Sequence, residues 1–143
     1  ERKLLWMNGE YIRKSQILEL KSQIIAFDSN LASINNFEQY LMLAQTRMKS
    51  LADFRALSIN STETVLNEKQ QALCEKLIEV YSNMSKWTKD LVNDATFSVR
   101  DETQTSTKDL YIVLTGRPQG LPLIDKLIID GKDFTITFLK SRA

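Results

Sequence analysis

The sequence predicts an α+β protein in which long coiled-coil helices, arranged as a helical hairpin or stalk, precede a small, mainly antiparallel sheet of three to four strands. Three observations lead to this fold class. Hydrophobic residues recur every seven residues through the first two thirds of the 143-residue chain, and a polar break interrupts them at 58–62. After residue 94 the hydrophobic period shortens to 2, which is typical of strands. The expected parts are a long heptad helix at 1–58, a second heptad helix at 62–93, and a small α/β or β domain at 95–143.

Residues 3 to about 58 are predicted to form one helix, because this stretch is free of proline and rich in helix-forming residues. Its apolar residues form two interleaved rows, Ile17, Ile24 and Leu31, and Leu20, Phe27, Ile34, Leu41 and Met48. A repeat of seven residues gives a narrow apolar seam, which another helix must cover. The polar runs at 28–30 and 35–36 lower helix propensity and allow a kink there.

A second helix is expected after the polar break, with Asn60 or Ser61 as its N-cap and Glu63 in its first turn. Two seams of similar length joined by about four polar residues favour an antiparallel helical hairpin. The alternative is a parallel dimer of one continuous helix. The helix interface predicted from both seams consists of Ile17, Leu20, Ile24, Phe27, Leu31, Ile34, Leu41, Met48, Leu73, Leu77, Val80, Met84, Trp87 and Leu91.

The C-terminal part predicts strands at 96–99, 110–114 and 134–139, where apolar or aromatic residues alternate with polar ones or form a short apolar run. Residues 117–120 break the second strand after Gly116, and Pro122 begins a short helix at 123–127. Alternatively, residues 126–129 form a strand and Asp130-Gly131 turns it into the last strand.

The composition argues against a catalytic function and against binding of nucleic acid. The 19 basic and 18 acidic residues give a net charge of +1, which provides no long-range attraction for a polyanion. The chain has no histidine, and its four glycines form no phosphate loop. The single cysteine, Cys74, lies beside the second seam, where it is either a buried structural thiol or a reactive one. We therefore expect no catalytic, cofactor-binding or metal-binding residues and no nucleic-acid partner.

Three short segments are candidate contact sites. Trp6 and Met7 suggest either a membrane-proximal interface or an extension of the seam. Trp87, with its neighbours Tyr81 and Met84, suggests either a peptide-binding cluster or core packing. Residues 117–120, Arg-Pro-Gln-Gly, suggest either a recognition loop or an ordinary turn.

The order of elements resembles a known family. Residues 109–116, 123–127 and 134–138 give strand, glycine, short helix and strand behind a long helical region. This order resembles the inner-membrane assembly-platform proteins of type IV pilus and type II secretion machines. The resemblance implies a coiled-coil stalk, half of a ferredoxin-like fold, and an inner-membrane anchor facing the bacterial periplasm. No run of about eighteen apolar residues occurs. Because the chain starts at Glu1 without an initiator methionine, we expect a fragment whose anchor lies upstream.

The function expected from the sequence is that of a non-enzymatic scaffold in a pilus or secretion assembly platform. Its partners would be a protein or a second copy of the chain, bound through the helices. One alternative is a segment of a trimeric viral or phage fibre or spike. Another is a kinetochore or tethering subunit that joins a coiled coil to a small α/β head.

Overall fold

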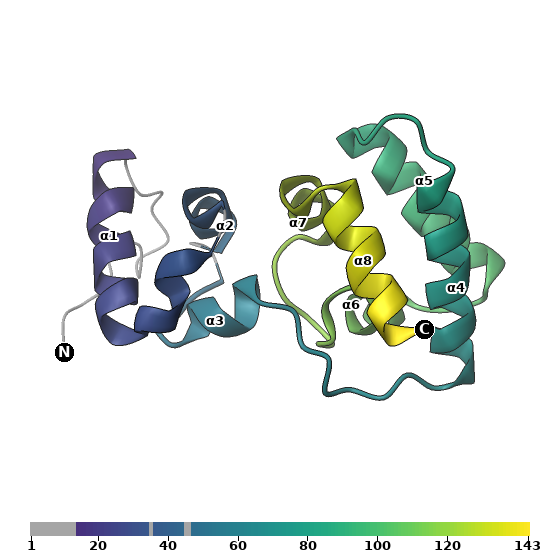
Figure 1. Cartoon of the computed structure of the whole chain (residues 1–143), viewed down its shortest axis with the longest axis horizontal. Coiled ribbons are helices and arrows are strands. Elements are labelled where there is room, and N and C mark those ends of the chain that lie inside the picture. The colour runs from purple at the N-terminus through teal and green to yellow at the C-terminus, as the bar shows by residue number, and fades with distance from the viewer. Residues whose placement is uncertain (1–13, 35, 45–46) are drawn as a thin grey trace. The chain divides into compact units, whose positions relative to one another are not determined.

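The computed structural model describes residues 14–34, 36–44 and 47–143, and all regular structure within these ranges is helical (Figure 1). The chain divides into two compact units, Glu1–Ile59 and Asn60–Ala143. Among the described residues, no helix has both the length and the apolar character needed to cross a bilayer. Because the described residues form helices and no strands, the predicted α+β fold, with its antiparallel sheet and half of a ferredoxin-like domain, is wrong.

The described residues of the first unit form four short helices: α1 (Lys14–Phe27), the 3-10 helix η1 (Ser29–Ser33), α2 (Phe37–Ala44) and α3 (Asp53–Ser58). α1 packs against η1 and α2, and α2 packs against α3. The aromatic rings of Phe37 and Phe54 stack with their centroids 4.6 Å apart, which joins α2 to α3. The apolar interior of this unit includes Ile17, Leu20, Ile24, Leu31, Phe37, Leu41, Ala44, Met48 and Phe54.

The expected single helix at 3–58 is wrong over the described part of this range. α1 ends because Asp28 has extended backbone angles (φ −142°, ψ 90°), and Asn36 adopts a left-handed conformation with φ 61°. Both residues lie in the polar runs that lower helix propensity, so the chain bends back where a kink was expected. Short helices of the same unit then cover most residues of the apolar rows, whereas Phe27 is exposed and Ile34 is half-buried.

Among the described residues of this unit, two ion pairs at the surface connect α1 with α2 and α3 with Asp28. The guanidinium of Arg55 in α3 donates to both carboxylate oxygens of Asp28, with distances of 2.6 and 2.9 Å. The Lys21 ammonium in α1 donates to Glu38 in α2 at 2.9 Å. The bidentate geometry makes the pair with Asp28 the more specific of the two.

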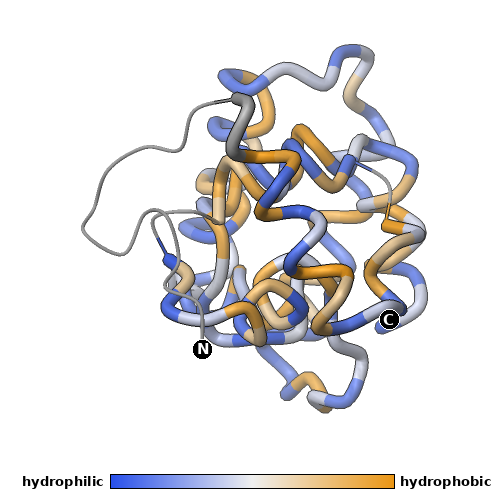
Figure 2. Tube along the Cα trace, turned by 90° about the vertical axis from the view of Figure 1, so that its left-hand side faces the viewer, coloured by the Kyte–Doolittle hydropathy of each residue, from blue (hydrophilic) through white to orange (hydrophobic). Residues whose placement is uncertain are grey.

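The second unit contains α4 (Glu68–Ser82), α5 (Lys89–Glu102), α6 (Thr107–Thr115), α7 (Leu123–Asp130) and α8 (Lys132–Arg142). α4 packs against α5, α6 and α8, while α7 packs against α5 and α8 (Figure 1). Figure 2 shows hydrophobic and hydrophilic residues alternating in short runs along the helical trace, as expected where each helix buries one face. The core contains Leu66, Leu73, Cys74, Leu77, Tyr81, Val92, Val99, Leu110, Val113, Leu114, Leu123, Ile124, Leu127 and Leu139.

The helix expected at 62–93 is wrong in its extent and continuity. α4 begins only at Glu68, where the Asn67 side chain accepts the Gln70 N–H and the Gln70 side chain accepts the Asn67 N–H. This reciprocal capping box satisfies two backbone donors at the helix start. α4 ends at Ser82, and Thr88 caps a separate helix, α5. Residues 60–66 are consequently not helical and are free to cross another part of the unit.

The expected strands at 96–99, 110–114 and 134–139 lie in α5, α6 and α8, respectively. In α6, the buried residues Leu110, Val113 and Leu114 have the spacing of one helical face. Thr135, one of the threonines that suggested a strand, instead donates its hydroxyl to the Gly131 carbonyl one turn earlier, at 2.8 Å. The short helix expected at 123–127 is confirmed as part of α7, whereas the alternative strand at 126–129 is wrong.

Candidate functional site

The connection between α6 and α7 is a tightly held loop, residues 116–122, which we call the α6–α7 loop. It begins at Gly116, which ends α6 in the left-handed conformation with φ 81°. A Cβ atom at this position would lie 1.7 Å from the carbonyl oxygen of Ser61. Glycine is needed here both for the positive φ and for the close approach of another backbone segment.

Side chains of α6 hold both ends of the α6–α7 loop. The Thr115 hydroxyl donates to the Tyr111 carbonyl at 2.7 Å, and its oxygen accepts the Arg117 N–H at 3.2 Å. The Tyr111 hydroxyl donates to the Leu121 carbonyl at 2.9 Å, and the Leu121 side chain is buried. These bonds reduce the conformational freedom of the loop before any ligand binds.

Residues 60–66, which we call the crossing segment, form a second set of hydrogen bonds with the start of the α6–α7 loop. The Ser61 N–H donates to the Thr115 carbonyl at 2.8 Å, and the Thr64 hydroxyl donates to the Gly116 carbonyl at 2.9 Å. Arg142, in α8, donates to the Thr64 carbonyl at 2.8 Å and to carbonyls in the last turn of α6. Burial lowers the pKa of this guanidinium, which nevertheless stays charged at neutral pH.

The tip of the α6–α7 loop faces solvent, since Pro118 and Gln119 are exposed and Arg117 is half-buried. The loop ends at α7, whose N-cap residue, Pro122, makes no side-chain capping bond. Within eight residues, the loop therefore offers the Arg117 guanidinium, the Gln119 side-chain amide and the positive end of the α7 dipole. This combination suits phosphate oxygens and the hydrogen-bonding edges of unpaired bases.

The N-termini of α4 and α6 form a second polar cluster in the same unit. Asp109 closes the capping box of α6 with Ser106 and also accepts the Gln70 side-chain N–H at 3.0 Å. The Gln70 amide and then the Ser106 N–H hold the pKa of the Asp109 carboxyl below its ordinary value. These bonds connect the capping boxes of two helices, so we assign the cluster a stabilising role.

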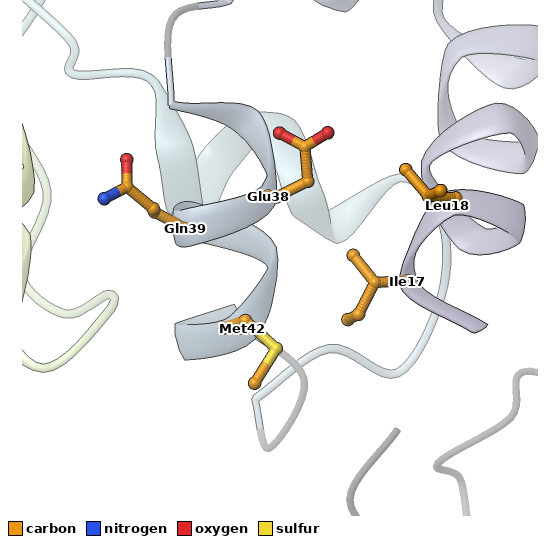
Figure 3. Close-up of a pocket in the computed structure, with 5 residues that line it drawn as sticks. All are labelled: Ile17, Leu18, Glu38, Gln39 and Met42. Atoms are coloured by element: carbon orange, nitrogen blue, oxygen red, sulfur yellow. The ribbon is translucent and has the colours of Figure 1, made fainter. Parts of the chain in front are cut away.

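An apolar pocket of about 490 Å³ lies in the first unit between α1 and α2. Figure 3 shows Ile17 and Leu18 of α1 on one side, with Glu38, Gln39 and Met42 of α2 on the other. The Leu18 and Met42 side chains are 61% and 47% exposed, so the pocket opens to solvent.

The predicted helix-interface residues fall mostly in the interiors of the two units. Buried members are Ile17, Leu20, Ile24, Leu31, Leu41, Met48, Leu73 and Leu77. Ile34, Val80, Met84 and Trp87 are half-buried, whereas Phe27 and Leu91 are exposed. Pairing of these residues with a second chain stays a prediction.

The aromatic and thiol candidates lie inside the second unit. Tyr81 is buried, its hydroxyl is 2.5 Å from that of Thr96, and its ring meets the Trp87 ring edge to face. The Trp87 indole N–H donates to the Leu127 carbonyl at 2.9 Å. Cys74 is buried, and its thiol lies 3.3 Å from the Leu139 carbonyl. Trp6 and Met7 lie outside the described residues, which contain no group of three potential metal ligands.

The sequence indicated only part of the α6–α7 loop arrangement. Glycine and proline at 116–120 marked residues 117–120 as an irregular segment and a candidate recognition loop. The contributions of Thr64 and Arg142 were missed, because these residues are 52 and 26 positions away from Gly116 in the chain. Such long-range contacts leave no local signal in a single sequence.

The described part of the chain thus defines a helical protein with a prearranged polar loop. Comparison with known proteins narrows this class of protein. No protein-family model matches the chain. The chain is 32% identical over 148 residues to glutamate–tRNA ligase 1 of Fervidobacterium nodosum, a match that covers 94% of the chain and 30% of the relative. Glutamate–tRNA ligases of Chlamydophila psittaci and Chlamydia muridarum are 28% and 29% identical, covering 94% and 92% of the chain and 30% and 29% of those relatives. The chain therefore spans less than a third of the length of these curated relatives.

These relatives correct the functional predictions. They are ligases, which contradicts both the non-enzymatic scaffold and the resemblance to pilus or secretion assembly platforms. None of the three is a fibre protein or a kinetochore or tethering subunit. Their names include tRNA, which contradicts the expectation of no nucleic-acid partner. That expectation relied on net charge, which does not register how individual cationic side chains are placed.

Proposed function

We propose that the chain is part of a glutamate–tRNA ligase and that its second unit binds tRNA through the α6–α7 loop. The observation that carries this proposal is the similarity to glutamate–tRNA ligases along more than nine tenths of the chain. The role of the loop is supported by its geometry, because the half-buried Arg117 and the exposed residues beside it lie on a loop that bonds hold at both ends. A ligase that acts on tRNA must bind the RNA as well as react with it, and such a loop suits binding.

The chemistry of the α6–α7 loop favours unpaired or distorted RNA over a regular duplex. Proteins read RNA sequence mostly in loops and bulges, where base edges are accessible to side chains and backbone groups. Arg117 offers a planar set of donors, and Gln119 offers both a donor and an acceptor. Because the backbone around them is already fixed, little ordering entropy is lost on binding.

Binding of a fluorescently labelled glutamate tRNA to the 143-residue chain, measured by anisotropy, tests the proposal. Arg117→Ala is expected to weaken binding about tenfold or more, the usual effect of losing one specific arginine contact. The matched control is Lys86→Ala, which also removes one positive charge but lies between α4 and α5. It should change the affinity by less than about twofold.

The salt dependence of binding identifies the atoms that Arg117 contacts. If the guanidinium binds phosphate, Arg117→Ala lowers the slope of log affinity against log salt by about 1, whereas loss of a base contact leaves the slope unchanged. Two results contradict the proposal. One is no binding of tRNA up to about 100 μM, which is weaker than ordinary non-specific binding. The other is equal affinity for the Arg117→Ala and Lys86→Ala variants.

A further inference from the structure

The peptide group between Gly116 and Arg117 is fixed from both sides by threonine hydroxyls. Its carbonyl oxygen accepts the Thr64 hydroxyl at 2.9 Å, and its N–H donates to the Thr115 hydroxyl oxygen at 3.2 Å. The orientation of a peptide group sets the direction in which the next Cα–Cβ bond points. Together the two threonines therefore determine how Arg117 leaves the backbone.

Thr115 belongs to the helix that ends at the α6–α7 loop, but Thr64 belongs to the crossing segment. Thr64 is held in turn by Arg142, whose guanidinium donates to the Thr64 carbonyl at 2.8 Å. The same guanidinium donates to the Ile112 and Val113 carbonyls in α6. Arg142 thus fixes Thr64 relative to the helix that carries the loop.

We infer that Thr64 is a positioning residue for Arg117 and that tRNA binding depends on its hydroxyl. The inference rests on the proposed function of the α6–α7 loop. Thr64 need not touch RNA in this role, because it acts through the Gly116 carbonyl. Loss of the hydroxyl leaves that carbonyl without this protein donor, and the peptide group can then rotate.

The test compares three single variants of the 143-residue chain. Thr64→Val keeps the shape of the side chain and removes the donor, whereas Thr64→Ser keeps the donor. Thr62→Val is the matched control, since Thr62 is an exposed residue of the same crossing segment. We expect Thr64→Val to weaken binding of labelled glutamate tRNA by about three- to tenfold, the effect of one hydrogen bond, and the other two variants to bind like the parent.

A local measurement separates positioning from a general loss of stability. Under the binding conditions all variants should show the same helical circular dichroism. Amide hydrogen exchange should be faster in the Thr64→Val variant for Arg117, Gln119 and Gly120 and unchanged for α4 and α5. Faster exchange throughout the second unit would indicate a merely structural role and would overturn the inference.

The other possible binding results distinguish a failure of the inference about Thr64 from a failure of the proposed tRNA binding. If the parent chain binds tRNA and Arg117→Ala weakens binding, but Thr64→Val binds like the parent, the inference is wrong and the proposed function stands. If the parent chain does not bind tRNA, the proposed function fails and the inference fails with it. Weak binding by Thr64→Val that Thr64→Ser also shows would mean that the hydroxyl is not the responsible group.

Discussion

Replacing Gly116 with alanine should be among the most damaging single changes in the second unit. A left-handed backbone costs a non-glycine residue about 1–2 kcal/mol. The new Cβ, 1.7 Å from the Ser61 carbonyl oxygen, forces the crossing segment away from α6. This movement breaks the bonds from the Ser61 N–H and from the Thr64 hydroxyl, each of which contributes about 1 kcal/mol. The expected loss in the free energy of unfolding is therefore about 3–4 kcal/mol.

Two other glycines provide graded controls for this prediction. At Gly131, with φ 87° and ψ 160°, an added Cβ meets open space, so alanine adds backbone strain of about 1–3 kcal/mol without a collision. At Gly120 nothing lies within 4 Å of the added Cβ and φ is not in the left-handed range, so the effect should stay within about 0.5 kcal/mol. Urea unfolding followed by circular dichroism at 222 nm measures all three variants. A Gly116→Ala variant as stable as the Gly120→Ala variant would refute the close approach of the two backbones.

Two further predictions concern titratable groups. Burial raises the pKa of the Cys74 thiol to about 11. At pH 8 this thiol should therefore react with a disulfide reagent at least about a hundredfold more slowly in the folded chain than in the chain unfolded in urea. Equal reaction rates would mean that the thiol is accessible in the folded chain. The hydrogen bonds from Arg55 hold the pKa of Asp28 below its ordinary value. The unfolded chain therefore binds more protons at this residue, and its contribution to stability, present above about pH 4, is lost as the pH falls through the lowered pKa. Acid unfolding followed by circular dichroism should show a smaller pH dependence for Asp28→Asn than for the parent, and identical profiles would rule out this contribution.

The sequence pattern identified many buried residues but not the elements that bury them. Ile17, Leu20 and Ile24 were predicted to be covered, and they are buried. A heptad row does not specify whether the covering helix belongs to another rod or to the same unit, and here the breaks near Asp28 and Asn36 return the chain onto itself. The pattern was thus informative about burial and silent about connectivity.

The strand predictions failed because β-propensity describes a side chain and not its surroundings. Thr135 and Leu139 alternate with bulky residues in the sequence, but as neighbours one helical turn apart they are both buried on one face of α8. Residues 110–114 were predicted to form a strand from their apolar run, but they lie in α6, which Ser106 caps. The α6–α7 loop was recognisable from its glycines and proline, whereas the hydrogen bonds that hold it are seen only in the three-dimensional structure.

The bond between Arg142 and Thr64 has an architectural consequence. It joins the last turn of α8 to the crossing segment, which lies 78 residues earlier in the chain. Together with the packing of α8 against α4, this guanidinium therefore links parts of the second unit that are far apart in the chain.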